Sequence, residues 1–338
     1  MVETLPIVAA GLALATLPLI AALVLRRVRV AYLERRQERL DREVAPLALA
    51  LVDGDDLVVP SLRPLEAEAL AGVLSRYAQV LNGDARERIA EFFERSGAIE
   101  GELRMLRARR AWRRATAAKT LGDMGSATGG PALVEALSDR HGSVRSAAAR
   151  SLGKLGFTDG VEPILRAFAA GAVPRAVAGL ALLEIGSPAV PALEELLDVE
   201  DENVRATAVE LIGRMGCARD SERLVACLDD PSAEVRARAS RALGRLGSAE
   251  ASRKLQRALD ARVPFLRAAA AVGLGRMGDP EALEKLIAQA CLDEFTPARA
   301  AAQAATKISP ERVTEAAACE GAGDLLREEA DRIAWGLA

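Results

Sequence analysis

A short pattern that recurs along the chain constrains the fold more than any other feature of this sequence. One copy reads VRSAAARSLGKLG and ends at Gly156, and another reads VRATAVELIGRMG and ends at Gly216. The pattern contains an arginine that returns every 30 to 32 residues, at Arg114, Arg145, Arg175, Arg205, Arg236, Arg267 and Arg299. Chance does not produce this register, so we assign these arginines a structural role in an internal repeat that spans residues 111–310.

Each copy of the pattern predicts two helices. The glycine that closes the pattern suits the left-handed cap of a first helix, and Asp279-Pro280 shows how a second helix begins, with an N-cap followed by proline. Small alanines stand where neighbouring backbones must approach. One helix pair cannot bury its apolar face alone, so the pairs must stack. The sequence therefore predicts an all-α fold, a right-handed α-solenoid of helix pairs.

These repeats resemble the HEAT-like family, in the short bacterial form that also occurs in phycobilisome lyases. The resemblance covers about Arg113 to Pro310 and rests on a loop aspartate, V-R six residues later, then A-A and L-G-x-L-G. The six-residue spacing holds for Asp139 with Arg145, Asp230 with Arg236 and Asp293 with Arg299. Asp198 and Asp260 lie one residue too early, so a continuous aspartate–arginine ladder is not expected there. The resemblance is specific for the fold and nearly silent about function.

An apolar segment near the N-terminus predicts a transmembrane helix in front of the solenoid. Leu5 to Leu25 contains no charged residue in 21 positions. As a helix it is about 31 Å long, enough for the hydrocarbon core of a bilayer. Glu3 precedes it and arginines follow it, which is the reverse of a signal peptide. We therefore assign residues 1–25 to an uncleaved anchor.

Basic residues directly after the apolar segment predict its orientation. Lys/Arg-rich flanks stay in the cytoplasm, so the repeats are expected inside a bacterial cell, at the inner membrane, with the N-terminus outside. These residues either bind anionic lipid headgroups or only fix the topology, and the sequence favours neither. They are Arg26, Arg27, Arg29, Arg35, Arg36 and Arg39.

The remaining segments are assigned to a linker and two caps. Residues 26–60 form a basic juxtamembrane helix that ends in a hinge at Leu51 to Pro60. Residues 61–110 form a helical N-terminal cap, and residues 311–338 form the C-terminal cap. Atypical ends are what a helical solenoid needs.

Composition argues against catalysis and against nucleic-acid binding. His141 is the one histidine, so neither a Ser-His-Asp arrangement nor the repeated His-Glu pairs of the di-iron hydroxylases are available. We therefore predict no cofactor, no metal and no small-molecule substrate. The net charge of -3 and the scarcity of aromatic residues oppose nucleic-acid binding. We interpret all four cysteines as buried, reduced thiols: Cys217, Cys227, Cys291 and Cys319.

Cations also recur two residues before the closing glycine. Two interpretations stay open. Stacking aligns these cations into a basic stripe that binds a partner, or they serve only to stabilise helix C-termini, by about 0.3 to 1 kcal/mol each. Asp123 and Glu184 interrupt the series. The cations are Lys154, Arg214, Arg245 and Arg276.

Together these features predict a membrane-tethered, non-enzymatic scaffold or accessory subunit that binds a protein, expected to be an integral membrane protein. The anchor, the arginine-rich helix and the segment RMLRARRAWRRATAAKTLGDMG resemble bacterial HEAT-repeat proteins that accompany membrane glycosyltransferases. That resemblance implies such a transferase as the partner. The alternatives are a bilin lyase-like enzyme or chaperone, and a nucleic-acid-binding HEAT-like module.

Overall fold

The computed structural model describes residues 4–54, 62–81, 83–216, 221–247, 249–319 and 321–337, with the side chains of the first helix from residue 22 onward. All regular elements in these ranges are helical. The chain forms two compact units. Unit 1 contains residues 1–108 and 119–129, and unit 2 contains residues 109–118 and 130–338.

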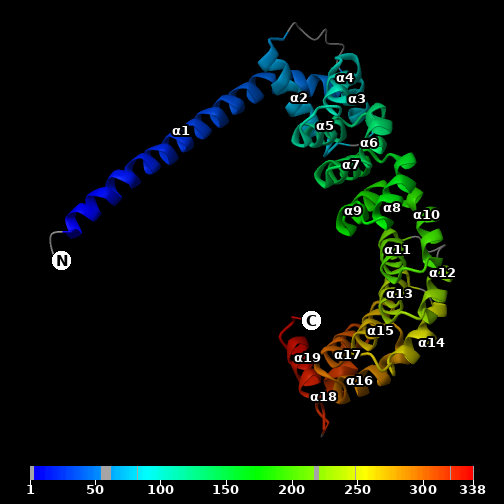
Figure 1. Ribbon diagram of the computed structural model, residues 1–338. Helices are drawn as coiled ribbons and strands as arrows, with labels where there is room; N and C mark the ends of the chain where they lie inside the picture. The colour runs from blue at the N-terminus through cyan, green and yellow to red at the C-terminus, as the bar shows by residue number, and fades with distance from the viewer. Residues whose placement is uncertain are drawn as a thin grey trace. The chain divides into compact units, whose positions relative to one another are not determined.

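Unit 1 is built around the C-terminal end of a long first helix. This helix, α1 (Thr4–Asp53), packs its last turns against α2 (Pro64–Ala78) and α3 (Asp84–Arg95), while its N-terminal part extends away from them (Figure 1). Val44 and Ala48 of α1 are buried in the core of the unit. Arg88 of α3 donates from Nε to the Val52 carbonyl oxygen at 2.9 Å, which satisfies an acceptor at the end of α1. Helix α4 (Ala98–Met105), the η1 turn (Ala127–Gly129) and the last part of α5 (Ala111–Met124) complete the unit.

The sequence predicted a transmembrane helix in the N-terminal half of α1, where the structure describes few side chains. The predicted span Leu5–Leu25 lies outside the residues with described side chains, except for its last four. Among the helices that are described, none is by itself both long and apolar enough for a transmembrane span. The pair Arg175–Ile185 and Ser187–Asp198 reaches that length and composition only together, with a bend of 117° between its two parts.

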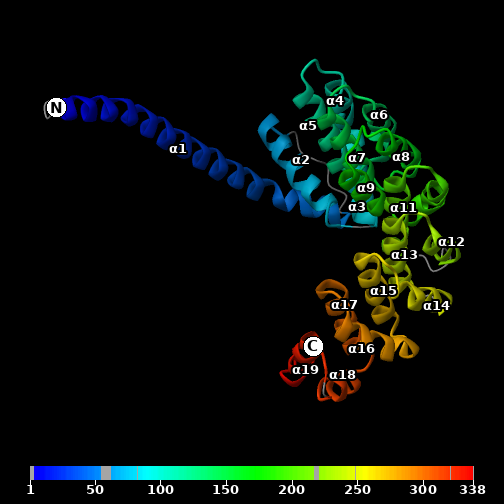
Figure 2. The ribbon, with the colours of Figure 1, turned by 60° about the horizontal axis from the view of Figure 1, so that its bottom comes forward.

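Unit 2 is a stack of helix pairs in two layers, as the repeat predicts. The first helices of the pairs follow one another in one layer, and the second helices follow one another in the other layer (Figures 1 and 2). The first helices are α7 (Gly142–Leu155), α9 (Arg175–Ile185), α11 (Glu202–Met215), α13 (Ala233–Leu246), α15 (Pro264–Met277) and α17 (Phe295–Ile308). The second helices are α6 (Gly130–Ala136), α8 (Val161–Ala169), α10 (Val190–Glu195), α12 (Ser221–Ala226), α14 (Ala249–Ala258) and α16 (Leu283–Leu292).

Short turns and two final helices complete this unit. Several second helices begin or end with a single 3₁₀ turn, and α18 and α19 follow the last pair. The turns are η2 (Thr158–Gly160), η3 (Ser187–Ala189), η4 (Leu196–Asp198), η6 (Cys227–Asp229) and η7 (Pro280–Ala282). The final helices are α18 (Pro310–Ala317) and α19 (Asp324–Ala334). The closing glycines of α7, α11, α13 and α15 have positive φ values of 62 to 78°, which confirms the predicted left-handed caps.

Glycines bring the backbones of successive first helices into contact. A Cβ atom added to Gly244 of α13 would lie 2.5 Å from Cα of Gly273 in α15. The glycines at the same position of the repeat in α7, α11 and α15, Gly153, Gly213 and Gly275, would meet Ala181, Ala242 and Ala304 with Cα distances of 2.6 to 2.8 Å. The predicted role of alanine therefore describes only one side of this contact. Glycine on the other side lets the helices come this close.

One junction lacks the glycine. In α9 the equivalent position, three residues before the closing Gly186, holds Leu183. Helix α9 contacts α11 less extensively than α7 contacts α9, which is the result expected where a side chain takes the place of bare backbone. The α9–α11 junction is therefore the least closely packed of those between first helices from α7 to α17.

We predict that Gly244→Ala destabilises the protein by about 1–3 kcal/mol, because backbone atoms of Gly273 leave no room for a methyl group. Gly142→Ala in α7 is the matched control, since its Cβ would make only ordinary contacts with the Arg145 side chain, from 3.5 Å. The control should change stability by no more than about 1 kcal/mol. Urea unfolding followed by circular dichroism measures both variants. Equal stability of Gly244→Ala and wild type would contradict the backbone contact.

Candidate functional site

The repeat arginines join one helix pair to the next. Arg114 donates from Nε to Asp139 Oδ2 at 2.6 Å and from Nη2 to Oδ1 at 2.8 Å. Arg205 holds Asp230 in the same way, at 2.8 and 3.0 Å. Arg267 holds Asp293, with 2.6 Å between Nε and Oδ2, and Nη2 donates to Oδ1. Each pair is 25 or 26 residues apart in sequence, so these bidentate ion pairs connect consecutive repeats.

The six-residue spacing between aspartate and arginine reflects a hydrogen bond from the arginine side chain to the aspartate backbone. Arg145 Nη1 donates to the backbone oxygen of Asp139 at 2.9 Å, and Arg236 Nη1 donates to that of Asp230 at 2.7 Å. The Asp139 carboxylate instead accepts the His141 N–H at 2.9 Å and faces the arginine of the preceding repeat. The carboxylate therefore binds the arginine of the preceding repeat and a backbone N–H of its own loop, while the arginine six residues later binds only the aspartate backbone.

The remaining repeat arginines have other surroundings. Arg175 is exposed at the start of α9. Arg299 lies over the Phe295 ring at 5.8 Å from its centroid and forms an ion pair with Glu328 at 3.7 Å. The two aspartates that lie one residue too early belong to a second series between second helices. Asp198 pairs with Arg223 at 2.7 Å and Asp260 with Lys285 at 2.6 Å, both 25 residues apart. These exposed pairs contribute little stability.

The buried ion pairs shift the acidity of their carboxyl groups. Hydrogen bonds from Arg114 hold the pKa of Asp139 below its ordinary value. At Asp230 burial acts in the opposite direction, but the hydrogen bonds from Arg205 and Ser232 prevail and the pKa is also lowered. A carboxyl group with a lowered pKa stabilises the fold above the pKa of the unfolded chain, about 3.9 for aspartate. That contribution disappears as the pH falls through the pKa of the folded state.

We expect Asp139→Asn to lower the unfolding temperature at pH 7, because Arg114 loses its carboxylate while the amide oxygen can still accept the His141 N–H. The difference from wild type should begin to shrink as the pH falls below about 4, and it should be lost once the pH passes the lowered pKa of Asp139 in the folded state. Thermal unfolding over a pH series measures it, with Asp198→Asn in an exposed pair as the control. A difference that stays constant into strong acid would contradict this assignment.

Three of the four cations predicted as a stripe come together in unit 2. Arg214, Arg245 and Arg276 are exposed at the C-terminal ends of α11, α13 and α15. Arg245 Nε donates to the Gly213 carbonyl oxygen at 3.1 Å, so this side chain reaches the preceding first helix. Burial and then the positive charges of Arg276, Arg214 and Arg241 lower the pKa of Arg245, while Glu210 opposes them. We call Arg214, Arg241, Arg245 and Arg276 the arginine cluster.

The fourth predicted cation lies elsewhere in the stack. Lys154 is half-buried at the end of α7, and α9 separates it from the cluster. Burial raises the pKa of Glu184 in α9, and the charge of Lys154 acts against that rise. The sequence prediction did not include Arg241. Its position four residues before Arg245, on the same face of α13, is the signal that identifies it.

The predicted membrane-surface arginines are fully accessible. All six of them, Arg26, Arg27, Arg29, Arg35, Arg36 and Arg39, are exposed on α1. Large apolar side chains between them are exposed as well, including Leu25 at 70% and Val28 at 60%. Residues 22–30 of α1 are all exposed, so this stretch has no packed face among the described residues.

Groups suited to catalysis do not gather in the described part of the chain. No group of three or more His, Cys, Asp or Glu residues there could hold a metal ion. Burial raises the pKa of the Cys227 thiol to about 11, so it stays protonated at neutral pH. Cys291 is half-buried and Cys319 is exposed, so the prediction that all four thiols are buried is wrong for Cys319, which lies just beyond the end of α18. Cys217 lies outside the described residues.

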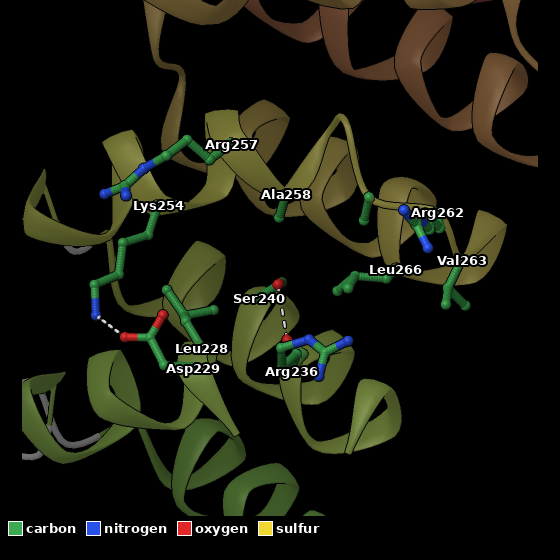
Figure 3. Close-up of a pocket in the computed structure, with 11 residues that line it drawn as sticks. Leu228, Asp229, Arg236, Ser240, Lys254, Arg257, Ala258, Arg262, Val263 and Leu266 are labelled. Atoms are coloured by element: carbon green, nitrogen blue, oxygen red, sulfur yellow. Dashed lines mark hydrogen bonds and ion pairs between the residues drawn. The ribbon is translucent and has the colours of Figure 1, made fainter. Parts of the chain in front are cut away.

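A pocket lies between α13, α14 and the start of α15. It has a volume of about 490 Å³. Arg236, Lys254, Arg257 and Arg262 line it, with Leu266 and other apolar side chains between them (Figure 3). Asp229 is the one acidic residue in its lining, and it pairs with Lys254 at 2.5 Å. We call this cavity the α13–α14 pocket.

A comparison with protein-family models agrees with this architecture. A family model described as HEAT repeats matches residues 103–174, 172–232 and 221–307. Human deoxyhypusine hydroxylase is similar at 22% identity over 81% of this chain and 98% of its own, with a TM-score of 0.32. The CpcE–CpcF phycocyanin lyase from Nostoc is similar at 18% identity over 84% and 97%, with a TM-score of 0.28. An engineered protein is similar at 18% identity over 88% and 90%, with a TM-score of 0.41. No curated protein matches the sequence.

Proposed function

The chain belongs to the HEAT-repeat family, and we propose that it is a non-enzymatic scaffold or accessory subunit that binds an acidic surface of a protein partner. HEAT repeats generally mediate protein–protein interaction. The proposed partner is an integral membrane protein at the cytoplasmic face of a bacterial inner membrane. A membrane glycosyltransferase is the partner class that the sequence resemblance implies.

The arginine cluster is the observation that carries this proposal. Arg245 reaches the preceding first helix through the Gly213 carbonyl oxygen, which brings it toward Arg214. Burial lowers the pKa of Arg245 most, and the positive charges of Arg276, Arg214 and Arg241 lower it further, so like charges repel one another here. Repulsion of this kind acts against the folded state, and an acidic surface would relieve it. Charges arranged in this way give specificity and fast association rather than catalysis.

Tethering to a membrane is supported by the exposed side chains of α1. Exposed apolar residues and arginines alternate along α1. The N-terminal part of this helix extends away from the rest of unit 1 (Figure 1). The apolar segment before them is long enough to cross a bilayer. Arginines beyond it would then lie at the headgroups of the cytoplasmic leaflet.

The proposal that the protein is not an enzyme rests on the chemistry of its thiol and carboxyl groups. The buried Cys227 has a raised pKa, which is the opposite of what an activated thiolate needs. The most buried ion pairs connect consecutive repeats and are fully engaged in doing so. Their carboxylates are therefore held as structural anions rather than as acids or bases near neutral pH.

Reversal of the cluster charges tests the proposal. We expect Arg214→Glu/Arg245→Glu/Arg276→Glu to reduce partner recovery from detergent-solubilised membranes by at least about tenfold, as expected for close charge pairs across an interface. Wild type should be found in the membrane fraction together with its partner. Mass spectrometry of the co-eluting proteins is the measurement, with circular dichroism to confirm folding.

The matched control reverses three exposed arginines of unit 2 outside the cluster, Arg175, Arg253 and Arg327. It changes the net charge equally and should leave partner recovery unchanged. Unchanged recovery by the cluster variant, or equal loss by the control, would remove the cluster as the binding surface.

A further inference from the structure

The junction after Arg236 lacks the carboxylate that completes three other junctions between repeats. Arg114, Arg205 and Arg267 each hold an aspartate 25 or 26 residues later. The residue 25 positions after Arg236 is Ala261, and the following residue is Arg262. The aspartate nearest in sequence, Asp260, pairs with Lys285 instead.

The Arg236 guanidinium nevertheless has the same anchoring as its complete counterparts. Its Nη1 donates to the Asp230 and Pro231 carbonyl oxygens at 2.7 and 2.9 Å. Arg205 Nη1 donates to the carbonyl oxygens of Val199 and Glu200 at 2.8 and 2.7 Å, which are the equivalent atoms one repeat earlier. The backbone thus fixes the guanidinium in a common orientation, whether or not a carboxylate is bound to it.

The opposite edge of this guanidinium remains available. In Arg205, Nε and Nη2 form the fork that holds the Asp230 carboxylate. Within the residues that the structure describes, no acceptor is bonded to Nε or Nη2 of Arg236. Arg145 also lacks an aspartate, but its Nε donates to the Ala172 carbonyl oxygen at 2.6 Å. Arg236 therefore combines fixed orientation with two unused donors.

Arg236 is also part of the lining of the α13–α14 pocket, which carries an excess of positive charge. Arg236 lines it together with Lys254, Arg257 and Arg262 (Figure 3). Only Lys254 has an acidic partner in the lining, Asp229. In the pocket at the next junction, Arg267 and Lys285 are neutralised by Asp293 and Asp260. The α13–α14 pocket thus has the excess of positive charge that its neighbour lacks.

We propose that the α13–α14 pocket binds an aspartate or glutamate side chain from an acidic segment of the protein partner. The carboxylate occupies the Nε/Nη2 fork of Arg236, where an aspartate of the chain itself lies at the complete junctions. Arg257 and Arg262 attract flanking acidic residues, and Leu266, Val263 and Leu228 offer an apolar wall to an aliphatic neighbour. This inference rests on the proposed function, because it takes the carboxylate from a protein partner.

A labelled peptide of alternating leucine and glutamate probes the pocket directly. Fluorescence anisotropy with the full chain in detergent is expected to show binding at least about tenfold tighter than for the same peptide with glutamine at every glutamate, a factor typical of a bidentate charged contact. Arg236→Gln should remove this preference. Arg145→Gln is the matched control, since the Nε of Arg145 already has an acceptor, and it should leave the preference unchanged.

A second variant separates loss of the site from loss of the fold. Ala261→Asp places a carboxylate 25 residues after Arg236, the distance at which Arg114 and Arg205 hold theirs, so it should fill the fork from within. We expect this variant to unfold at a higher temperature than wild type and to bind the glutamate peptide at least about tenfold more weakly. Wild-type affinity of Ala261→Asp, or equal binding of the two peptides by wild type, would overturn the proposal.

The two proposals fail in different ways. If reversal of the arginine cluster leaves partner recovery unchanged while Ala261→Asp still abolishes peptide binding, the proposed binding surface fails and the carboxylate site stands. If partner recovery depends on the cluster while the peptide binds Ala261→Asp as it binds wild type, the carboxylate site fails and the proposed function stands.

Discussion

Backbone contact between successive first helices sets the spacing of the helix pairs in unit 2. At Gly153, Gly213, Gly244 and Gly275 no side chain separates one helix from the next. This short distance allows an arginine at the start of one helix to reach an aspartate in the following repeat, as Arg205 reaches Asp230. It also allows Arg245 to reach the Gly213 carbonyl oxygen, which brings the arginine cluster together at the other ends of the helices.

Helix α9 departs from the repeat pattern at three positions, and these differences show which contacts the regular residues make in the other first helices. Leu183 stands where the contact glycine is expected, Glu184 replaces the cation of the basic series, and Arg175 is exposed at the start of the helix. The α9–α11 junction is the less closely packed one. Lys154, on the far side of α9, is accordingly separated from the arginine cluster. The proposed acidic partner therefore faces α11, α13 and α15 rather than the whole stack.

Local signals in the sequence predicted the helix pairs well. The sequence analysis did not predict the side-chain contacts between consecutive repeats. The arginine period and the closing glycines identified the helix pairs, because both depend on a few neighbouring residues. The partner of Asp139 was missed, since the six-residue spacing to Arg145 does not show that the carboxylate faces the preceding repeat. The distinctive position of Arg236 could have been found by counting 25 residues forward from each repeat arginine to Ala261, but only the structure shows that this is the pairing distance.

Amide hydrogen exchange of the full chain, followed by mass spectrometry, tests most directly whether glycine contacts hold the helix pairs together. Amides in closely packed helices exchange only through larger openings of the structure. The account predicts that α11, α13 and α15 exchange slowly and at a common rate, while α9 exchanges faster because Leu183 replaces the contact glycine. Protection of α9 equal to that of α13 would contradict the claim that this glycine contact determines the cohesion of the stack.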